Sequence, residues 1–361
     1  MPNHIVTELR PDDRRSMRLL HQLLLEEGIR KDQNLDYTCG IFDDDLNLIA
    51  TGSCFGNTLR CLAVSSSHQG EGLMNQIVTH LTEVQFARGN THLFLYTKCS
   101  SAQFFRDLGF YEIIRVDGQI VFMENQRNGF SAYLDHLLAE SEKAAASLCS
   151  ADLQNKKDVS AIVMNANPFT LGHRYLIEQA ANVSSIVHLF IVSEDRSLIP
   201  ASVRKQLVLS GTADFKNVLY HDSGDYIISS ATFPSYFQKD DTAVMESHAR
   251  LDLAVFCRIA EKLGITTRFV GEEPKSIVTG IYNQIMKEAL PKHGICCKII
   301  PRLCTGEGKL ISASTVREAL KEGNDKLFRQ LVPDSTYAYF HSDAAKNVLQ
   351  ALRQAKTVIH D

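Results

Sequence analysis

The sequence predicts an α/β protein whose two halves are built differently. In the second half, short apolar segments alternate with amphipathic segments of helical periodicity, from 159–164 to 296–301. Such alternation is typical of a parallel sheet covered by helices on both faces. In the first half, turn-rich segments of alternating polarity indicate antiparallel strands mixed with helices. The chain has 361 residues, more than one typical domain of roughly 100–200 residues, so we expect two domains.

Composition restricts the class of protein. Hydrophobic residues make up 44% of the chain and charged residues 22%, which fits a globular protein. The net charge is −4 and no basic run with interleaved aromatic residues is present, so we expect no nucleic-acid partner. No run approaches the ~18 apolar residues of a membrane span. The N-terminal segment also lacks an apolar signal core, so we expect a cytoplasmic protein that has no membrane partner.

The nine cysteines are irregularly spaced and include no CxxC pair. This pattern fits neither a disulfide framework nor a structural zinc site. We therefore expect reduced, mostly buried thiols and no protein-bound metal. Cys296 and Cys297 fall in a predicted strand, where packing is the favoured interpretation.

Residues 1–129 are expected to form the first domain, a mixed α/β unit. Its predicted elements are helices at 12–28, 72–89 and 100–109, strands within 39–66 and at 91–98, and a hairpin at 109–125. Residues 130–157 are polar and alanine-rich, and we interpret them as a connecting helix and linker.

The second domain is expected over 158–340, followed by a C-terminal helix in 341–361. Its predicted strands are 159–164, 186–192, 218–221, 266–271 and 296–301, and its helices are about 172–182, 202–212, 246–263, 278–290 and 314–322. This order predicts a Rossmann-like, doubly wound parallel sheet. Ligands of that architecture bind beyond the carboxyl ends of the strands.

The segment NANPFTLGHRYLIEQA, 165–180, follows the first of these strands. Gly172 would let a backbone or a phosphate come close, and the following helix offers N–H groups and a positive dipole end to an anion. Thr170 and His173 can donate hydrogen bonds to a phosphoryl oxygen. The alternative is that Thr170 caps the helix and His173 is a solvated first-turn residue. The segment alone leaves both interpretations open.

A second hydroxyl-rich helix start occurs in GEGKLISASTVREALKEG, 306–323. It contains Ser312, Ser314 and Thr315, with Arg317 one turn further on. Hydroxyl and N–H groups at a helix start bind phosphate, and arginine holds it with two hydrogen bonds. This start follows the last strand, so we expect it to face the first turn across the sheet edge.

The pair of segments resembles the nucleotidyltransferase superfamily. NPFTLGH is similar to the signature (H/T)xGH, and ISASTVR is similar to ISSTxxR. The resemblance implies attack on the α-phosphate of ATP with pyrophosphate leaving. It assigns Thr170 and His173 to the α-phosphate, and Arg317 to the β and γ groups. Further implied ATP-binding residues are Asn165, Asn167, Phe169, Gly172, Gly271, Glu272, Glu273, Ser312, Ser314 and Thr315.

Within that resemblance, VGEEP at 270–274 is similar to the loop that approaches the adenine and ribose. A plain acidic turn would have the same sequence pattern and is the alternative. Arg204 is similar to a residue near the substrate, and an exposed helix arginine is the alternative.

The first domain contains Gln69, Gly70, Glu71 and Gly72 between a predicted strand and helix. Glycines there can expose N–H groups to a pyrophosphate, or simply form a turn. The stretch resembles motif A of the GCN5-related N-acetyltransferase (GNAT) fold, and FFRDLGF at 104–110 resembles motif B. The resemblance implies binding of a coenzyme A arm. Phe105 replaces the tyrosine that protonates the leaving thiolate in many members, and Met74 replaces a small residue, so we do not expect ordinary acetyl transfer to an amine.

The whole chain resembles the [citrate (pro-3S)-lyase] ligase family over essentially 1–340. The resemblance implies ATP-dependent acetylation of the phosphoribosyl-dephospho-CoA thiol on the citrate lyase acyl carrier subunit. Acetate would react through acetyl-AMP, releasing AMP and pyrophosphate. Mg²⁺ is expected with ATP, although no carboxylate cluster identifies its protein ligands.

Three alternatives remain open from the sequence. One is a relative that acts on the malonate decarboxylase carrier. Another is an adenylyltransferase for a small phosphate such as phosphopantetheine or nicotinamide mononucleotide. The third is a regulatory protein that binds CoA and ATP without turnover.

Overall fold

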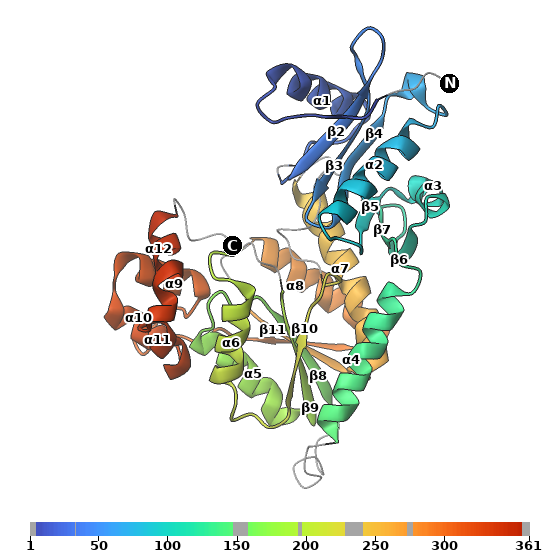
Figure 1. Cartoon of the computed structure of the whole chain (residues 1–361). Helices are drawn as coiled ribbons and strands as arrows, with labels where there is room; N and C mark the ends of the chain where they lie inside the picture. The colour runs from blue at the N-terminus through green and yellow to red at the C-terminus, as the bar shows by residue number, and fades with distance from the viewer. Residues whose placement is uncertain are drawn as a thin grey trace. The chain divides into compact units, whose positions relative to one another are not determined.

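The computed structural model describes residues 5–32, 34–146, 158–193, 197–227, 241–272 and 277–355 (Figure 1). The chain divides into two compact units, residues 1–131 with 233–254, and residues 132–232 with 255–361. Part of the predicted linker, 147–157, and the end of the predicted C-terminal helix, 356–361, lie outside the described residues. The domain boundaries drawn from the sequence stay predictions.

The first unit contains a seven-stranded sheet in the order β1-β2-β3-β4-β5-β7-β6. Its strands are β1 Thr7–Glu8, β2 Tyr37–Phe42, β3 Leu48–Phe55, β4 Thr58–Val64, β5 Phe94–Thr97, β6 Tyr111–Val116 and β7 Ile120–Glu124. Neighbouring strands pair antiparallel except β4 and β5, which pair in parallel at Thr58–Phe94 and Leu59–Leu95. The predicted hairpin at 109–125 is confirmed as β6 and β7.

Helices cover both faces of this sheet. They are α1 Arg14–Glu26, α2 Leu73–Ala87 and α3 Ala102–Asp107. Leu20 and Leu24 of α1 pack in one buried cluster with residues of β3 and β4. Ile77 and Leu81 of α2 pack in another, where a Cβ on Gly52 would lie 2.5 Å from Ile77. The glycine therefore permits the close approach of α2 to the sheet.

The second unit contains a five-stranded sheet, β10-β9-β8-β11-β12. Its strands are β8 Val159–Met164, β9 Ile186–Ile191, β10 Val218–Asp222, β11 Thr267–Gly271 and β12 Cys296–Ile300. Every neighbouring pair is parallel, which confirms the predicted doubly wound sheet. The chain passes from β8 to β9 and β10 on one side, then returns to β11 on the other. The carboxyl ends of β8 and β11 thus form the switch point where such sheets bind ligands.

The helices of this unit lie on both sides of the sheet. They are α5 Leu171–Val183, α6 Ala201–Gly211, α8 Ile277–Ala289, α9 Ala313–Glu322, α10 Asp325–Leu331, α11 Asp334–Phe340 and α12 Lys346–Gln354, with most of α4 Gly129–Ala145 and the end of α7 Asp241–Leu263, whose residues up to Ala254 belong to the first unit. Right-handed crossovers put α5 and α6 on one face and α8 on the other, as Figure 1 shows. Helices α9 to α12 form a cluster beside α6. The sequence predictions did not include α10 and α11, and α7 begins earlier than expected.

The main core of the second unit lies on the face covered by α5 and α6. It joins side chains of β8 and β9 to those of α5, α6 and α9 to α12. Phe169, in the turn between β8 and α5, is fully buried in this core. The turn that carries the candidate site is therefore anchored by an apolar side chain.

Every cysteine in the described part of the chain is a free thiol, as predicted. Cys39, Cys54, Cys61 and Cys257 are buried. The packing interpretation of Cys296 is wrong, because this residue opens the edge strand β12 and is exposed, while Cys297 is half-buried. Cys149 lies outside the described residues. Among the described helices, none combines the length and the apolarity that crossing a bilayer would require.

Candidate functional site

The turn after β8 ends in a reciprocal cap at the start of α5. Thr170 is the N-cap: its Oγ1 accepts from the backbone N–H of His173 at 3.2 Å. In return, the imidazole Nδ1 of His173 accepts from the backbone N–H of Thr170 at 3.1 Å. Thr170 is 1% exposed and His173 is half-buried. The predicted cap is present, but His173 is part of it and is not a plain solvated residue.

The cap determines how His173 can act. An Nδ1 that accepts a hydrogen bond carries no proton, so the neutral imidazole carries its proton on Nε2. Burial, together with the smaller effect of the nearby positive charge of Arg302, lowers the pKa of His173 to about 4. The side chain is therefore neutral at physiological pH. It offers an Nε2–H donor to a ligand and does not offer a positive charge.

The start of the same turn is held by Arg204 of α6. Its Nη1 donates to the carbonyl oxygens of Asn165 and Val192, both at 2.8 Å, and also contacts the side-chain oxygen of Asn165. Its Nε donates to the carbonyl of Ile199 at 3.1 Å. Arg204 is 0% exposed, so the interpretation as an exposed helix arginine is wrong. The buried guanidinium holds the ends of β8 and β9 together.

A second polar helix start is formed by α9. Ser312 is its N-cap, and its Oγ accepts from the backbone N–H of Thr315 at 3.1 Å. The two hydroxyl oxygens are 2.8 Å apart. Ser312, Ser314 and Thr315 are half-buried, whereas Arg317 is 3% exposed. The first turn of α9 thus gathers hydroxyl groups beside backbone N–H groups at the positive end of the helix dipole.

The structure brings the two turns together through two contacts. In the first, Nη1 of Arg317 donates to the carbonyl oxygen of Asn167 at 2.5 Å, while its Nη2 lies 3.5 Å from the Ser314 hydroxyl within α9 itself. A Cβ on Gly172 would lie 3.3 Å from the carbonyl oxygen of Ile311, the residue before the α9 cap. The close approach expected at Gly172 is therefore to the backbone of the second turn.

Arg302, which the sequence analysis did not single out, lies between these turns. It follows β12, and its Nε donates to the carbonyl of Glu272 at 2.7 Å. Its Nη1 donates to the carbonyl of Ile311 at 3.4 Å. Burial lowers the pKa of Arg302, although a guanidinium keeps its proton in proteins. A charged residue directly after a predicted strand of a parallel sheet was the signal available in the sequence.

Gly271 and Glu272 lie at the end of β11 and are exposed. Because β11 pairs with β8, they belong to the same carboxyl edge as the two turns. Glu273 and Pro274 lie outside the described residues. Their part of the predicted adenine-binding loop stays a prediction.

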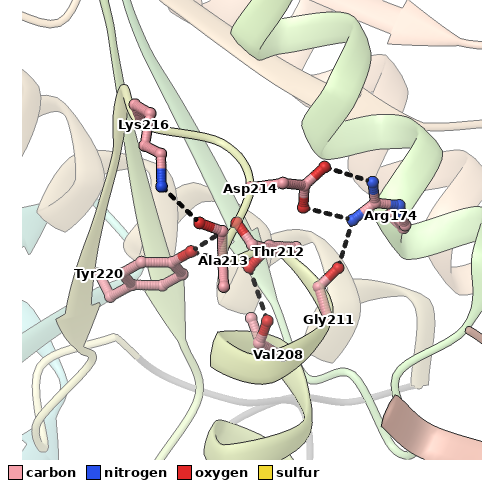
Figure 2. Close-up of polar contacts among 8 residues, drawn as sticks. All are labelled: Arg174, Val208, Gly211, Thr212, Ala213, Asp214, Lys216 and Tyr220. Atoms are coloured by element: carbon pink, nitrogen blue, oxygen red, sulfur yellow. Dashed lines mark hydrogen bonds and ion pairs between the residues drawn. The ribbon is translucent and has the colours of Figure 1, made fainter. Parts of the chain in front are cut away.

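The first turn of α5 is also fixed from its outer side, as Figure 2 shows. Arg174 makes two hydrogen bonds to the Asp214 carboxylate, at 2.8 and 2.6 Å, and one to the carbonyl of Gly211. Its guanidinium also lies 4.7 Å from the ring centroid of Phe215. Arg174 follows His173 directly, so this link to the end of α6 restricts the position of the histidine.

In the first unit, the predicted glycine turn lies at the start of α2. Gly70 and Gly72 have φ of 88° and 77°, and Gly72 is the N-cap of α2. Gln69, Gly70, Glu71 and Gly72 are all exposed. A Cβ on either glycine would meet no atom within 4 Å, so the backbone conformation, not crowding, favours glycine here. Phe105 is buried in the core.

Known proteins match this chain over most of its length. A family model described as the citrate lyase ligase C-terminal domain matches residues 159–340. The chain is 37% identical to a [citrate [pro-3S]-lyase] ligase of Escherichia coli, over 98% of this chain and 96% of the relative. It is 36% identical to the corresponding protein of Haemophilus influenzae, over 91% and 96%.

Two solved structures are similar to parts of the chain. One is an acyl-CoA N-acyltransferase of Pseudomonas aeruginosa, with 15% identity and a TM-score of 0.31, covering 34% of this chain and 99% of its own. The other is described as a nicotinate-nucleotide adenylyltransferase of Vibrio parahaemolyticus, with 15% identity and a TM-score of 0.35, covering 56% and 99%. The sequence relationships, which extend over nearly the whole chain, show that this protein belongs to the citrate lyase ligase family.

Proposed function

We propose that this member of the family, an acid–thiol ligase, acetylates the phosphoribosyl-dephospho-CoA thiol on the acyl carrier subunit of citrate lyase through acetyl-AMP. The observation that carries the proposal is the hydrogen bond from Arg317 to the carbonyl of Asn167. It joins two helix starts, each suited to a phosphate, at the switch point of one parallel sheet. A triphosphate can therefore contact both.

The first step would occur in the second unit. A carboxylate oxygen of acetate attacks the α-phosphorus of ATP, and the bond to the pyrophosphate oxygen breaks. Nε2–H of His173 would donate to an α-phosphoryl oxygen, where negative charge accumulates in the transition state. Thr170 contacts the Nδ1 side of the ring and the backbone N–H of His173. We therefore assign Thr170 the orientation of the imidazole, together with the phosphate contact expected from the sequence.

The β and γ groups would bind at the start of α9. Its backbone N–H groups and the hydroxyls of Ser312, Ser314 and Thr315 suit phosphoryl oxygens. Asn165, Asn167, Phe169 and Gly172 would shape the opposite wall, and Gly271 with Glu272 would approach the adenosine. The leaving pyrophosphate keeps these contacts while acetyl-AMP forms.

In the second step, the thiolate of the carrier's prosthetic group attacks the acetyl carbonyl. The new C–S bond forms, the bond from the carbonyl carbon to the phosphate oxygen breaks, and AMP leaves. The thiol proton passes to solvent. We propose that the glycine turn at Gln69–Gly72 holds the pyrophosphate of the prosthetic arm, because N–H groups are available at the start of α2. Phe105 has no proton to supply, so the first unit would bind and present the thiol.

Mg²⁺ is proposed to enter with the phosphates of ATP. The described residues include no group of three or more His, Cys, Asp or Glu side chains that could hold a metal ion. No step is therefore assigned to a resident metal centre.

The proposal is tested by acetate-dependent exchange of labelled pyrophosphate into ATP, together with mass spectrometry of the citrate lyase carrier. The wild-type protein should catalyse the exchange and add one acetyl group to the carrier. His173→Ala should slow the exchange by roughly 10²–10³-fold, the effect of losing one transition-state donor. His293→Ala, at an exposed histidine of the same unit, is the matched control and should leave the rate unchanged.

Other results would redirect the assignment. Exchange that requires a phosphate monoester in place of acetate would favour an adenylyltransferase. Acetylation of a malonate decarboxylase carrier in preference to the citrate lyase carrier would change the partner. Binding of ATP and CoA without any turnover would contradict the proposal.

A further inference from the structure

Asn165 is the first residue after β8, and the orientation of its side-chain amide is fixed by Arg204. The amide oxygen of Asn165 contacts Nη1 of Arg204, which is fully buried. A guanidinium only donates hydrogen bonds, so the atom that faces it must be the amide oxygen and not the nitrogen. The two N–H groups of the amide therefore lie on the side away from this guanidinium nitrogen.

These N–H groups are available to a ligand. Asn165 is half-buried, and within the described part of the chain the hydrogen bonds of its side chain are confined to the oxygen. The next residue, Ala166, is buried with a φ of 51°, in the left-handed region that a residue with a Cβ adopts only at a cost. The chain thus retains a strained residue directly after Asn165, and such strain clusters at functional sites.

The position of Asn165 in the sheet separates it from the groups proposed to bind the β and γ phosphates. Arg204 ties Asn165 to the end of β9, because the same Nη1 also donates to the carbonyl of Val192. The start of α9 is tied to the other neighbour of β8, because Arg302 joins the carbonyl of Glu272, after β11, to the residue before the α9 cap. Asn165 and the proposed pyrophosphate site therefore lie on opposite sides of the β8–α5 turn.

This arrangement of the turn suits an in-line displacement. The attacking and leaving oxygens of such a reaction lie on opposite sides of the α-phosphorus. The leaving group is pyrophosphate, so the attacking acid would approach from the β9 side. A neutral amide suits one oxygen of a monoanionic carboxylate while the other oxygen attacks. Because the amide oxygen of Asn165 accepts from a charged donor, its N–H groups are also stronger donors.

We infer that Asn165 binds the carboxylate of the attacking acid through its side-chain N–H groups, and that Arg204 is the positioning residue that orients this amide. This inference rests on the proposed function and names the group that recognises the acid, whereas the motif resemblance assigned Asn165 to ATP. The carboxylate oxygen bound by Asn165 becomes the carbonyl oxygen of acetyl-AMP. The other oxygen forms the new bond to phosphorus as the bond to pyrophosphate breaks.

The experiment measures KM for acetate and KM for ATP in pyrophosphate exchange by Asn165→Asp and Asn165→Ala. Aspartate keeps an acceptor for Arg204 but has no N–H group, and alanine removes the donor without adding a charge. Both should raise KM for acetate by about 10- to 100-fold, the loss expected for a hydrogen bond to a charged group. Asn165→Asp should keep Tm within about 2 °C of wild type, because its carboxylate still accepts from Arg204.

Binding of labelled ATP, measured by equilibrium dialysis without acetate, separates the two substrates without requiring turnover. Asn165→Ala should change both this affinity and KM for ATP by less than about threefold. The matched control is Asn217, which precedes β10 at the opposite edge of the sheet. Its Nδ2 donates to the carbonyls of Ala181 and Ser184 at 3.0 and 2.9 Å. Asn217→Asp should lower Tm and leave KM for acetate within about twofold of wild type.

Different results would contradict the proposed function and the assignment of Asn165. Absence of acetate-dependent exchange by the wild-type protein would overturn the proposed function. Exchange by the wild-type protein with an unchanged KM for acetate in Asn165→Ala would overturn this inference alone. So would a rise in KM for acetate in Asn165→Asp only, since repulsion by the new carboxylate would explain it. An equal rise in KM for ATP in Asn165→Ala would assign the amide to ATP.

Discussion

Arg317 and Asn167 are separated by 150 positions in the chain, yet Nη1 of the arginine donates to the carbonyl oxygen of the asparagine at 2.5 Å. The contact joins the turn after β8 to the first turn of α9. Both residues are 3% exposed, so a break in this contact would remove a hydrogen bond from a charged group in a buried position, which is costly. The geometry of the candidate active site thus depends on residues that hold the turns, as well as on those that face the ligand.

Replacing Arg204 by methionine should destabilise the second unit. Its guanidinium donates to backbone carbonyls of Asn165, Val192 and Ile199. Methionine would fill similar volume but leave these acceptors without the donor, at a cost of about 3 kcal/mol in unfolding free energy. Denaturant unfolding measures this cost, and pyrophosphate exchange should fall with it because the β8–α5 turn loses its anchor.

The neighbouring residue provides the control. Lys205 is 42% exposed and pairs with Asp222 at 2.7 Å. Lys205→Met should change the unfolding free energy by less than about 1 kcal/mol, as for other surface ion pairs. Equal destabilisation by the two substitutions would contradict the role given to Arg204.

Gly211→Ala should disturb the site by overpacking. A Cβ there would lie 2.5 Å from Cε1 of Phe169, which is fully buried two residues before the α5 helix. We expect a loss of about 1–3 kcal/mol in unfolding free energy. We also expect slower pyrophosphate exchange, because movement of Phe169 displaces Thr170 and His173.

Replacing Gly280 by alanine should change the unfolding free energy in the opposite direction. Gly280 is exposed in α8, and an added Cβ would meet nothing within 4 Å. Gly280→Ala should raise the unfolding free energy by about 0.4–1 kcal/mol, because alanine restricts the unfolded chain. If both substitutions shift Tm in the same direction, the packing argument for Gly211 is wrong.

The stability of the second unit should decrease in acid because of buried histidines. Nδ1 of His188 lies 3.0 Å from Nε2 of His221, across β9 and β10. Burial lowers the pKa of His188 to about 3, and burial also lowers the pKa of His221. Between about pH 6.5 and pH 3 the unfolded chain binds protons that the folded chain does not. The stability present above pH 6.5 is therefore lost as the pH falls.

Urea unfolding between pH 7.5 and pH 4 tests this expectation. His188→Gln should be less stable at pH 7.5, but its unfolding free energy should fall less steeply, by up to about 1.4 kcal/mol per pH unit. A variant with the same slope as the wild-type protein would show that His188 does not contribute to the acid sensitivity.

The proposed division of labour between the units is tested at Gly72. Gly72→Glu places a bulky anion where the prosthetic arm would bind. It should spare acetate-dependent pyrophosphate exchange and reduce acetylation of the carrier by at least about tenfold, since the new carboxylate would repel the pyrophosphate of the arm. Exchange and mass spectrometry are measured on the same preparation.

Gly89→Glu is the matched control, because Gly89 follows the other end of α2 with a φ of 87°, and nothing lies within 4 Å of its added Cβ. The two variants share backbone strain, and only the first lies at the proposed arm site. Equal loss of acetylation in both would assign the effect to strain. Loss of exchange in Gly72→Glu alone would show that the first unit takes part in the activation step.

The alternation of strands and helices made the second unit predictable. Apolar runs such as 159–164 and 186–192 match β8 and β9 closely, because strands buried on both faces of a parallel sheet must be continuously apolar. The cap at Thr170 was also recognisable, since hydroxyl residues at helix starts satisfy free N–H groups. The short helices α10 and α11 were not predicted. They pack with α9 and α6, and such contacts leave a weak periodic signal in segments as short as Asp325–Leu331.

The sequence by itself determined the α/β class, the order of elements in the second unit, the two hydroxyl-rich helix starts and the resemblance to the family. Each of these features depends on residues that are close together in the chain, because periodicity, capping and motif spacing are local properties of a sequence. Only the tertiary structure decided that Arg204 is buried, that Arg317 holds the Asn167 carbonyl, and that Arg302 lies between the two turns. The physical reason is that a guanidinium is long and makes several hydrogen bonds, so its role depends on which distant carbonyls the sheet topology brings within its reach.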